Sequence, residues 1–279
     1  MGKNCCIEAR TRTLGIMSTD RRRPFTTEPL VTAVPFGERT RGRAVPILTA
    51  ADKAALGAVG TVVRMPKGAL VYRALARAAN LYNIVEGALK TYQVLPDSST
   101  HISGFHFPGD LVGMAEEGRY IETAEAIIPI VAYEIPQAEF QAVMTRDGGL
   151  AVRVICKLTD ALRKKDSHAL ILDREDAVGK LAMFMLMLEG ARQARGPGGT
   201  IYFPMTRVDV AKYVGLTIET VSRAFNLLET HAIVRFIDRH HFYVLDRARL
   251  EAMAAGTAET MPTVAPKKAG RRTRRKQAS

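Results

Sequence analysis

The amino-acid sequence predicts an α+β fold in three successive parts: a compact antiparallel β-roll or barrel, a long helix, and a helix-turn-helix with a β wing. Between residues 62 and 136, short apolar or alternating runs are separated by glycine and proline, which is typical of short strands joined by turns. Past Phe140, apolar residues recur at three- and four-residue steps, as on one face of a helix. Residues 207–228 then place a glycine, a small residue and apolar residues as a helix-turn-helix requires.

The order of these patterns divides the 279 residues into five segments. The runs that predict the roll are LVYRAL, LYNIVEGALKTYQVL, HISGFHF and EAIIPIVAYEI. The expected segments are a basic, mostly disordered extension (1–45), the β-roll (46–145), the long helix (146–172), the winged helix-turn-helix (173–250) and a basic disordered tail (251–279).

The net charge of +12 lies at the two ends of the chain. Residues 1–45 contain nine Lys or Arg and four Asp or Glu, while residues 262–279 contain seven Lys or Arg and no acidic residue. The middle of the chain is neutral. We therefore expect the tail either to solubilise the protein or to bind phosphate without sequence preference. Met17 is an alternative start of translation.

Composition predicts a cytoplasmic protein that does not enter a membrane. The sequence has no run of about 18 apolar residues and no apolar signal-type block near its N-terminus. Its cysteines are Cys5, Cys6 and Cys156, an odd number without paired spacings, which fits a reducing compartment.

The long helix is expected to pair with the same helix of a second copy, although packing on its own chain alone is the alternative. Cys156 lies on it near Ile155 and Leu158, so we interpret its thiol as a small buried apolar group rather than a redox sensor. The residues predicted for the dimer contact are Val154, Ile155, Leu158, Ala161, Leu162 and Leu172.

The helix-turn-helix pattern has Gly215 at its turn and Ala211 at the helix contact. The apolar packing positions are Val210, Val214, Leu216, Val221 and Ala224. The following segment, AIVRFIDRHHFYVLD, predicts two short strands at 232–237 and 242–245, which form a wing.

The second helix of this motif is predicted to read bases in the major groove of DNA, while the wing and helix ends meet phosphates. With its apolar residues turned inward, Glu219, Ser222 and Arg223 share the outer face. Arginine can bind guanine O6 and N7 together, and glutamate can accept from cytosine N4. A surface salt bridge between Glu219 and Arg223 is the alternative. The predicted DNA-binding residues are Thr206, Arg207, Thr217, Glu219, Thr220, Ser222, Arg223 and Asn226.

Three stretches carry a family resemblance: LYNIVEGALKTY, FHFPGDLVG and MTRVDVAKYVGLTIETVSRAFNLLE. Through them, roughly residues 50–250 resemble the CRP/FNR family of bacterial transcription regulators. GLTIETVSR resembles its FixK branch, in which a Glu, two residues and then Ser-Arg stand on the recognition helix. The resemblance implies a cyclic-nucleotide-binding-like β-roll, a dimerisation helix and a C-terminal winged helix. It also implies double-stranded DNA, a second copy and RNA polymerase as partners, a TTGAT, four bases, ATCAA palindrome, and activation of genes for low-oxygen or nitrogen-oxide metabolism.

The chain departs from relatives that bind cyclic AMP through a Gly-Glu pair followed by Arg-Ser. Gly109 and Asp110 resemble the first pair, but Glu122 and Thr123 stand in place of Arg-Ser. Because a carboxylate repels a phosphate, we expect no cyclic nucleotide to bind. Arg119 could substitute only if its loop shifted.

No cofactor is expected. Three cysteines, two of them adjacent, cannot supply the four thiolates of an iron-sulfur cluster within one subunit. A haem bound by His101 or His106 is an alternative, although isolated histidines on short strands usually belong to the surface or the core.

Motifs of known catalytic sites are missing from the sequence, since it has no P-loop, no G-x-S-x-G elbow and no H-E-x-x-H. The sequence therefore predicts a homodimeric, sequence-specific transcription activator rather than an enzyme. A nonspecific architectural DNA-binding protein would explain the basic ends but not the Glu-Ser-Arg face.

Overall fold

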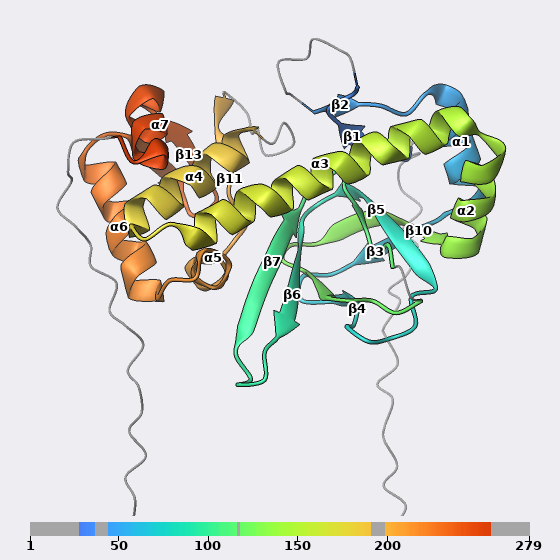
Figure 1. Cartoon of the computed structure of the whole chain (residues 1–279), viewed down its shortest axis with the longest axis horizontal. Helices are drawn as coiled ribbons and strands as arrows, with labels where there is room; N and C mark the ends of the chain where they lie inside the picture. The colour runs from blue at the N-terminus through green and yellow to red at the C-terminus, as the bar shows by residue number, and fades with distance from the viewer. Residues whose placement is uncertain (1–27, 37–43, 116–117, 191–198, 258–279) are drawn as a thin grey trace, which may run out of the picture.

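The computed structural model describes residues 28–36, 44–115, 118–190 and 199–257, and the predictions for the basic ends fall mostly outside these ranges. In Figure 1 one long helix, α3, runs from α1 and α2 on the right to the helix-turn-helix on the left, and the β-roll lies below its middle. The α+β class and the order of parts are confirmed.

The roll consists of two four-stranded sheets in the orders β3-β10-β5-β8 and β4-β9-β6-β7, with antiparallel neighbours throughout. The sheets bury one shared core, to which Ile84 and Leu89 contribute from opposite sheets. The strands are β3 (Thr61–Met65), β4 (Leu70–Tyr72), β5 (Asn80–Glu86), β6 (Leu89–Val94), β7 (Thr100–His106), β8 (Leu111–Val112), β9 (Thr123–Ala126) and β10 (Ile130–Pro136).

Gly87 makes the turn between β5 and β6 possible. Its φ of +87° is in the left-handed region, and an added Cβ would overlap the carbonyl oxygen of Pro129. Glycine is therefore required at this position of the roll.

Part of the predicted disordered extension is folded. At the end of this segment, β1 (Thr32–Ala33) pairs with β2 (Val45–Pro46), and Val31 and Ala33 are buried. The sequence pattern missed this because two-residue strands carry no periodicity. Helix α1 (Ala50–Val59) then packs against α2 (Gln137–Arg146) beside the roll.

Helix α3 (Gly148–Asp173) has 26 residues and begins at Asp147, whose carboxylate accepts a hydrogen bond from the Leu150 amide at 3.0 Å. The helix begins two residues later and ends one residue later than predicted. One face is buried against the roll and the C-terminal half of the chain. The opposite face remains largely exposed in the single chain.

The C-terminal half contains α4 (Ala177–Gly190), β11 (Ile201–Tyr202), α5 (Arg207–Val214), α6 (Ile218–Thr230), β12 (Val234–Asp238), β13 (His241–Val244) and α7 (Arg247–Ala255). The two wing strands lie within two residues of their predicted positions. Helix α7 corrects the prediction that a disordered tail begins at residue 251. Leu250 and Met253 are buried against α4, so tertiary packing stabilises a segment whose composition suggested disorder.

A buried ionic cluster fastens α3 to the roll. One carboxylate oxygen of Asp110 lies 2.5 Å from the Lys157 ammonium and 3.0 Å from that of Lys164. The second oxygen accepts a hydrogen bond from the Phe107 amide, and Lys157 also donates to the Thr32 carbonyl at 2.7 Å. The roll, α3 and the N-terminal strand β1 thus meet at this cluster.

Replacement of Asp110 by Asn should cost about 3 kcal/mol of unfolding free energy at pH 7, because two ammonium groups lose their nearest counter-ion and keep the more distant Asp160, at 3.9 and 3.7 Å. Burial alone would raise the pKa of this carboxyl, but Lys164 and Lys157 hold it well below its ordinary value. Its contribution is therefore present above the unfolded pKa of about 4 and is lost as the pH falls further.

Urea unfolding of the wild type and Asp110→Asn at pH 7 and pH 3 measures this effect. The exposed Asp166→Asn on the same helix is the matched control. A gap between wild type and Asp110→Asn that stays constant on acidification would contradict the prediction.

Candidate nucleic-acid interface

Helices α5 and α6 meet across a tight turn. Thr206 and Asp209 form a capping box at the start of α5, in which the Thr206 amide donates to Asp209 at 3.0 Å and the Asp209 amide donates back at 3.1 Å. Gly215 ends α5 with a φ of 69°. Thr217 then caps α6 by accepting from the Thr220 amide at 3.2 Å. The predicted glycine turn is therefore present.

The inner face of α6 is completely buried and fixes the rotation of the helix. Phe225 meets Phe203 and Phe236 edge-on, with ring centroids 5.9 and 5.4 Å apart. Because Phe236 lies on β12, the wing and α6 share one aromatic cluster. The buried residues of α6 are Val221, Ala224, Phe225 and Leu228, as well as Thr220.

The outer face presents the polar side chains expected from the sequence. Glu219, Arg223 and Asn226 are exposed and Ser222 is half-buried. The Arg223 guanidinium makes two long hydrogen bonds, 3.4 Å to the Glu219 carbonyl and 3.5 Å to the Thr220 hydroxyl. These weak internal contacts leave the guanidinium able to turn toward a ligand.

Thr220 does not lie where its predicted role requires. Its side chain is only 1% exposed, and its hydroxyl lies 3.0 Å from that of Thr217 inside the turn. Thr220 stabilises the start of α6, and we leave it out of the proposed DNA surface.

Arg207 is held by aromatic rings at the junction of α5, α6 and the wing. Its guanidinium carbon lies 3.8 Å from the Phe225 ring centroid and 4.5 Å from that of Phe236. Burial lowers the pKa of Arg207, and its Nη1 is buried without a hydrogen-bond partner in the described part of the chain. Thr206, next to it, is exposed.

The wing adds basic residues that the sequence analysis did not name. Arg235 on β12 and Arg239 at the turn into β13 are both exposed. The RHH run at the predicted turn was a signal for them, since cations on a wing suit phosphate contacts.

The predicted dimer residues divide between two faces of α3. Ile155, Leu158 and Leu162 are 51%, 44% and 62% exposed, and Ala161 is exposed beside them. The prediction that Val154 lies in the dimer contact is wrong, because Val154 is buried in a cluster with Leu56 and Phe140.

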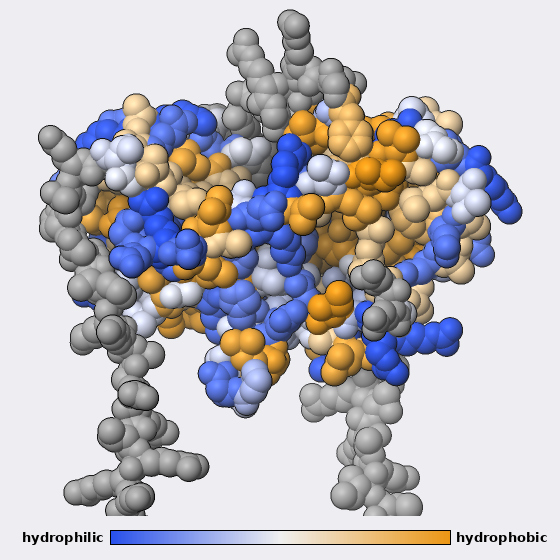
Figure 2. All heavy atoms as spheres, viewed as in Figure 1, coloured by the Kyte–Doolittle hydropathy of each residue, from blue (hydrophilic) through white to orange (hydrophobic). Residues whose placement is uncertain are grey.

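Leu172 is half-buried near the Gly215 turn, away from the exposed stripe. Cys156 is 5% exposed, consistent with its interpretation as a buried apolar residue. The exposed stripe also includes two residues that were not predicted, Val152 and Leu170. Figure 2 shows apolar and charged side chains interleaved across the face on which α3 lies.

Polar groups inside the roll bind one another. Glu122 pairs with Lys165 of α3 at 3.0 Å, and His106 lies 3.1 Å from the Thr91 hydroxyl. Burial lowers the pKa of His106 to about 4, so its imidazole is neutral at pH 7. Asp110 is the other residue at a position that binds cyclic AMP in some relatives. Its carboxylate is paired with Lys157 and Lys164.

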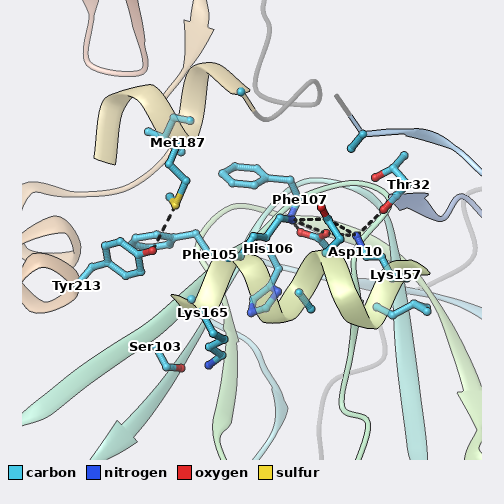
Figure 3. Close-up of a pocket in the computed structure, with 18 residues that line it drawn as sticks. Thr32, Ser103, Phe105, His106, Phe107, Asp110, Lys157, Lys165, Met187 and Tyr213 are labelled. Atoms are coloured by element: carbon cyan, nitrogen blue, oxygen red, sulfur yellow. Dashed lines mark hydrogen bonds and ion pairs between the residues drawn. The ribbon is translucent and has the colours of Figure 1, made fainter. Parts of the chain in front are cut away.

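A cavity of about 190 Å³ lies where the roll, α3, α4 and α5 meet. Figure 3 shows Met187 and Tyr213 at one end and Asp110, Lys157 and Thr32 at the other. Within residues 28–36, 44–115, 118–190 and 199–257, no group of three or more His, Cys, Asp or Glu side chains could hold a metal ion. The same ranges contain no helix that is long and apolar enough to cross a membrane.

Two family models match the chain: a Crp-like helix-turn-helix domain over residues 179–253 and a cyclic nucleotide-binding domain over residues 62–147. The nitrogen fixation regulation protein FixK of Bradyrhizobium diazoefficiens is 34% identical over 209 residues, which cover 75% of this chain and 88% of FixK. The transcriptional activatory protein AadR of Rhodopseudomonas palustris is 32% identical over 179 residues, 64% of this chain and 74% of AadR. The solved structure of FixK2 from Bradyrhizobium japonicum matches with a TM-score of 0.65 at 30% identity, covering 70% of this chain and 97% of FixK2.

The α5–α6 pair, its wing and these relatives define a transcription regulator with a helix-turn-helix DNA-binding domain. The chain belongs to the CRP/FNR family and is FixK-like.

Cyclic AMP should leave the melting temperature unchanged, because Glu122 opposes a phosphate and is already paired with Lys165. Differential scanning fluorimetry with cyclic AMP at about 1 mM measures this. A ligand with a Kd of about 10 µM would then be present at about a hundredfold excess over its Kd and would stabilise the folded protein by roughly 2.7 kcal/mol. A clear rise in melting temperature would show that the roll accepts the nucleotide.

Proposed function

We propose that this protein is a cytoplasmic, homodimeric transcription activator that recognises a TTGAT, four bases, ATCAA palindrome. The observation that carries the proposal is the outer face of α6, where Glu219, Ser222 and Arg223 lie together above a fully buried inner face. A rigidly seated helix with a polar outer face suits base readout in the major groove.

The chemistry of these side chains matches the proposed half-site. Arg223 can donate two hydrogen bonds to O6 and N7 of the guanine in TTGAT, and Glu219 can accept from N4 of the paired cytosine. A carboxylate at this position would otherwise be repelled by phosphate. Its presence therefore favours sequence-specific readout over general attraction to DNA.

Phosphate contacts in this proposal come from Thr206, Thr217 and the wing cations Arg235 and Arg239. Arg207 supports them by joining α5 to α6 and the wing through its aromatic contacts. Such contacts set the register of the protein on the duplex but do not select the sequence.

A dimer is supported by the exposed stripe on α3. Ile155 and Leu162 are seven residues apart and more than half exposed, as expected for a helix that pairs with a second copy. Two copies would present two α6 helices to two half-sites, which matches a palindrome.

The biological setting follows from the relatives. Activation of transcription is supported by AadR, whose name describes an activatory protein. The proposed role in low-oxygen or nitrogen-oxide metabolism rests on the resemblance of the recognition helix to the FixK branch of the CRP/FNR family. RNA polymerase is then the partner that an activator contacts. Transcription from a palindrome-bearing promoter, measured with and without oxygen in cells with and without this protein, tests this setting.

Replacement of Arg223 by Ala should abolish about 1 to 3 kcal/mol of discrimination at the half-site guanine. The measurement is the Kd for the palindrome, for a duplex with that guanine replaced, and for a scrambled duplex. Arg239→Ala is the matched control, and it should weaken all duplexes alike and reduce the salt slope by about one. Equal binding of palindrome and scramble by the wild type would favour a nonspecific architectural protein instead.

Replacement of Leu162 by Glu should halve the mass in sedimentation equilibrium, because it places a charge on each side of the proposed helix pair. Affinity for the full palindrome should fall about a hundredfold, since two linked half-sites are no longer engaged together. Val94→Glu at the end of β6 is the control, since Val94 is 65% exposed and the tip of the β6–β7 hairpin points away from α3 (Figure 1). A wild type that sediments as a monomer, on or off DNA, would contradict the dimer.

A further inference from the structure

Lys90 connects the roll directly to the DNA-binding half. Its ammonium lies 3.0 Å from a carboxylate oxygen of Asp209 on α5 and 3.3 Å from the Glu125 carboxylate on β9. The side chains of Lys90, Glu125 and Asp209 are 17%, 26% and 10% exposed, so this ionic triad is shielded from solvent. Burial alone would lower the pKa of Lys90, but the two carboxylates raise it, and the ammonium is charged at pH 7.

The carboxylate that Lys90 contacts also forms the first turn of α5. The other oxygen of Asp209 accepts from the amide and the hydroxyl of Thr206, at 3.0 and 2.6 Å. Thr206 and its neighbour Arg207 stand at the end of α5 that faces phosphate in the proposed complex. Lys90 is therefore linked to Thr206, on the proposed DNA surface, through the Asp209 carboxylate, which both side chains contact.

The opposite end of α5 is fixed by other parts of the molecule. His168 of α3 lies 2.7 Å from the Tyr213 carbonyl, and Lys180 of α4 donates to the Val214 carbonyl at 3.2 Å. These side chains cap the C-terminal carbonyls of the helix. Lys90 supplies the corresponding contact from the roll at the N-terminal end, so the orientation of α5 is determined from both ends.

Loss of the Lys90 ammonium would leave the carboxylates of Glu125 and Asp209 facing each other without a cation. Like charges in a partly buried site repel strongly, and the repulsion would push the start of α5 away from the roll. It would also leave Asp209 uncompensated beside Thr206, where a phosphate approaches. Both effects oppose DNA binding.

We propose that Lys90 is a positioning residue for DNA binding, which holds the N-terminal end of α5 in the orientation that α6 and the wing need on the duplex. The inference rests on the proposed function and extends it, because it assigns a roll residue to the DNA-binding machinery. It requires no bound effector: the roll acts on α5 through a permanent ionic contact.

The test measures the Kd of full-length variants for the palindrome at fixed ionic strength. Lys90→Met should bind about tenfold more weakly than the wild type. Lys67→Met removes the same charge from an exposed turn of the roll and should change the Kd little. Lys90→Arg, which keeps the cation, should retain most of the affinity.

The double variant Lys90→Met, Glu125→Gln separates positioning from folding. It removes the repulsion together with the cation, so it should recover most of the lost affinity and keep the fold if the single variant is unstable. Hydrogen exchange of the α5 amides should quicken in Lys90→Met and return toward the wild-type rate in the double variant, while the β12–β13 amides stay unchanged.

Lys90→Met binding equal to Lys67→Met, or tighter than the wild type, would overturn the inference. So would a double variant that binds as weakly as the single one while its melting temperature equals that of the wild type. A wild type that does not distinguish palindrome from scramble would instead refute the proposed function, because the comparison of variants presupposes specific binding.

Discussion

The seating of α3 on the roll is the constraint on which the rest of the structure depends. Asp110 binds Lys157 and Lys164, and Lys157 in turn holds the N-terminal strand through Thr32. A helix of 26 residues is about 39 Å long, so its orientation at the roll decides where the distant DNA-binding half lies. With the inner face of α3 fixed in this way, Ile155 and Leu162 lie on its exposed face. Helix α4, which follows α3, packs against the helix-turn-helix.

Local pattern predicted the parts of the chain but not the contacts between them. Helical periodicity located α3 and α6, and the glycine at position 215 located the turn between α5 and α6. Val154 and Thr220 were assigned to exposed faces because periodicity gives a stripe without saying what covers its edges. Val154 is buried by residues distant in sequence, and Thr220 is buried with its hydroxyl beside that of Thr217 at the turn. The strands β1 and β2 and the end of α7 were missed because short or Ala-rich segments are stabilised by packing rather than by their own pattern.

The candidate site shows the same division. Glu219, Ser222, Arg223 and Asn226 could be placed on one outer face from spacing alone. Spacing could not place Arg207 over Phe225 and Phe236, or the Lys90–Asp209 pair, whose members are 119 residues apart. These contacts depend on tertiary packing: Arg207 joins α5 to α6 and the wing, and Lys90 joins the roll to the start of α5. Inside the roll, Glu122 already pairs with Lys165, so any effector there would have to compete with a charge-assisted contact.

In the proposed function, one chain positions one recognition helix, and two chains together read a palindrome. Hydroxyl-radical footprinting of the TTGAT, four bases, ATCAA duplex tests it most directly, because the method reports where each copy lies on the DNA. Two protected stretches on one face of the duplex, about one helical turn apart, are the expected result. Protection of a single half-site, or uniform protection along the duplex, would contradict the account.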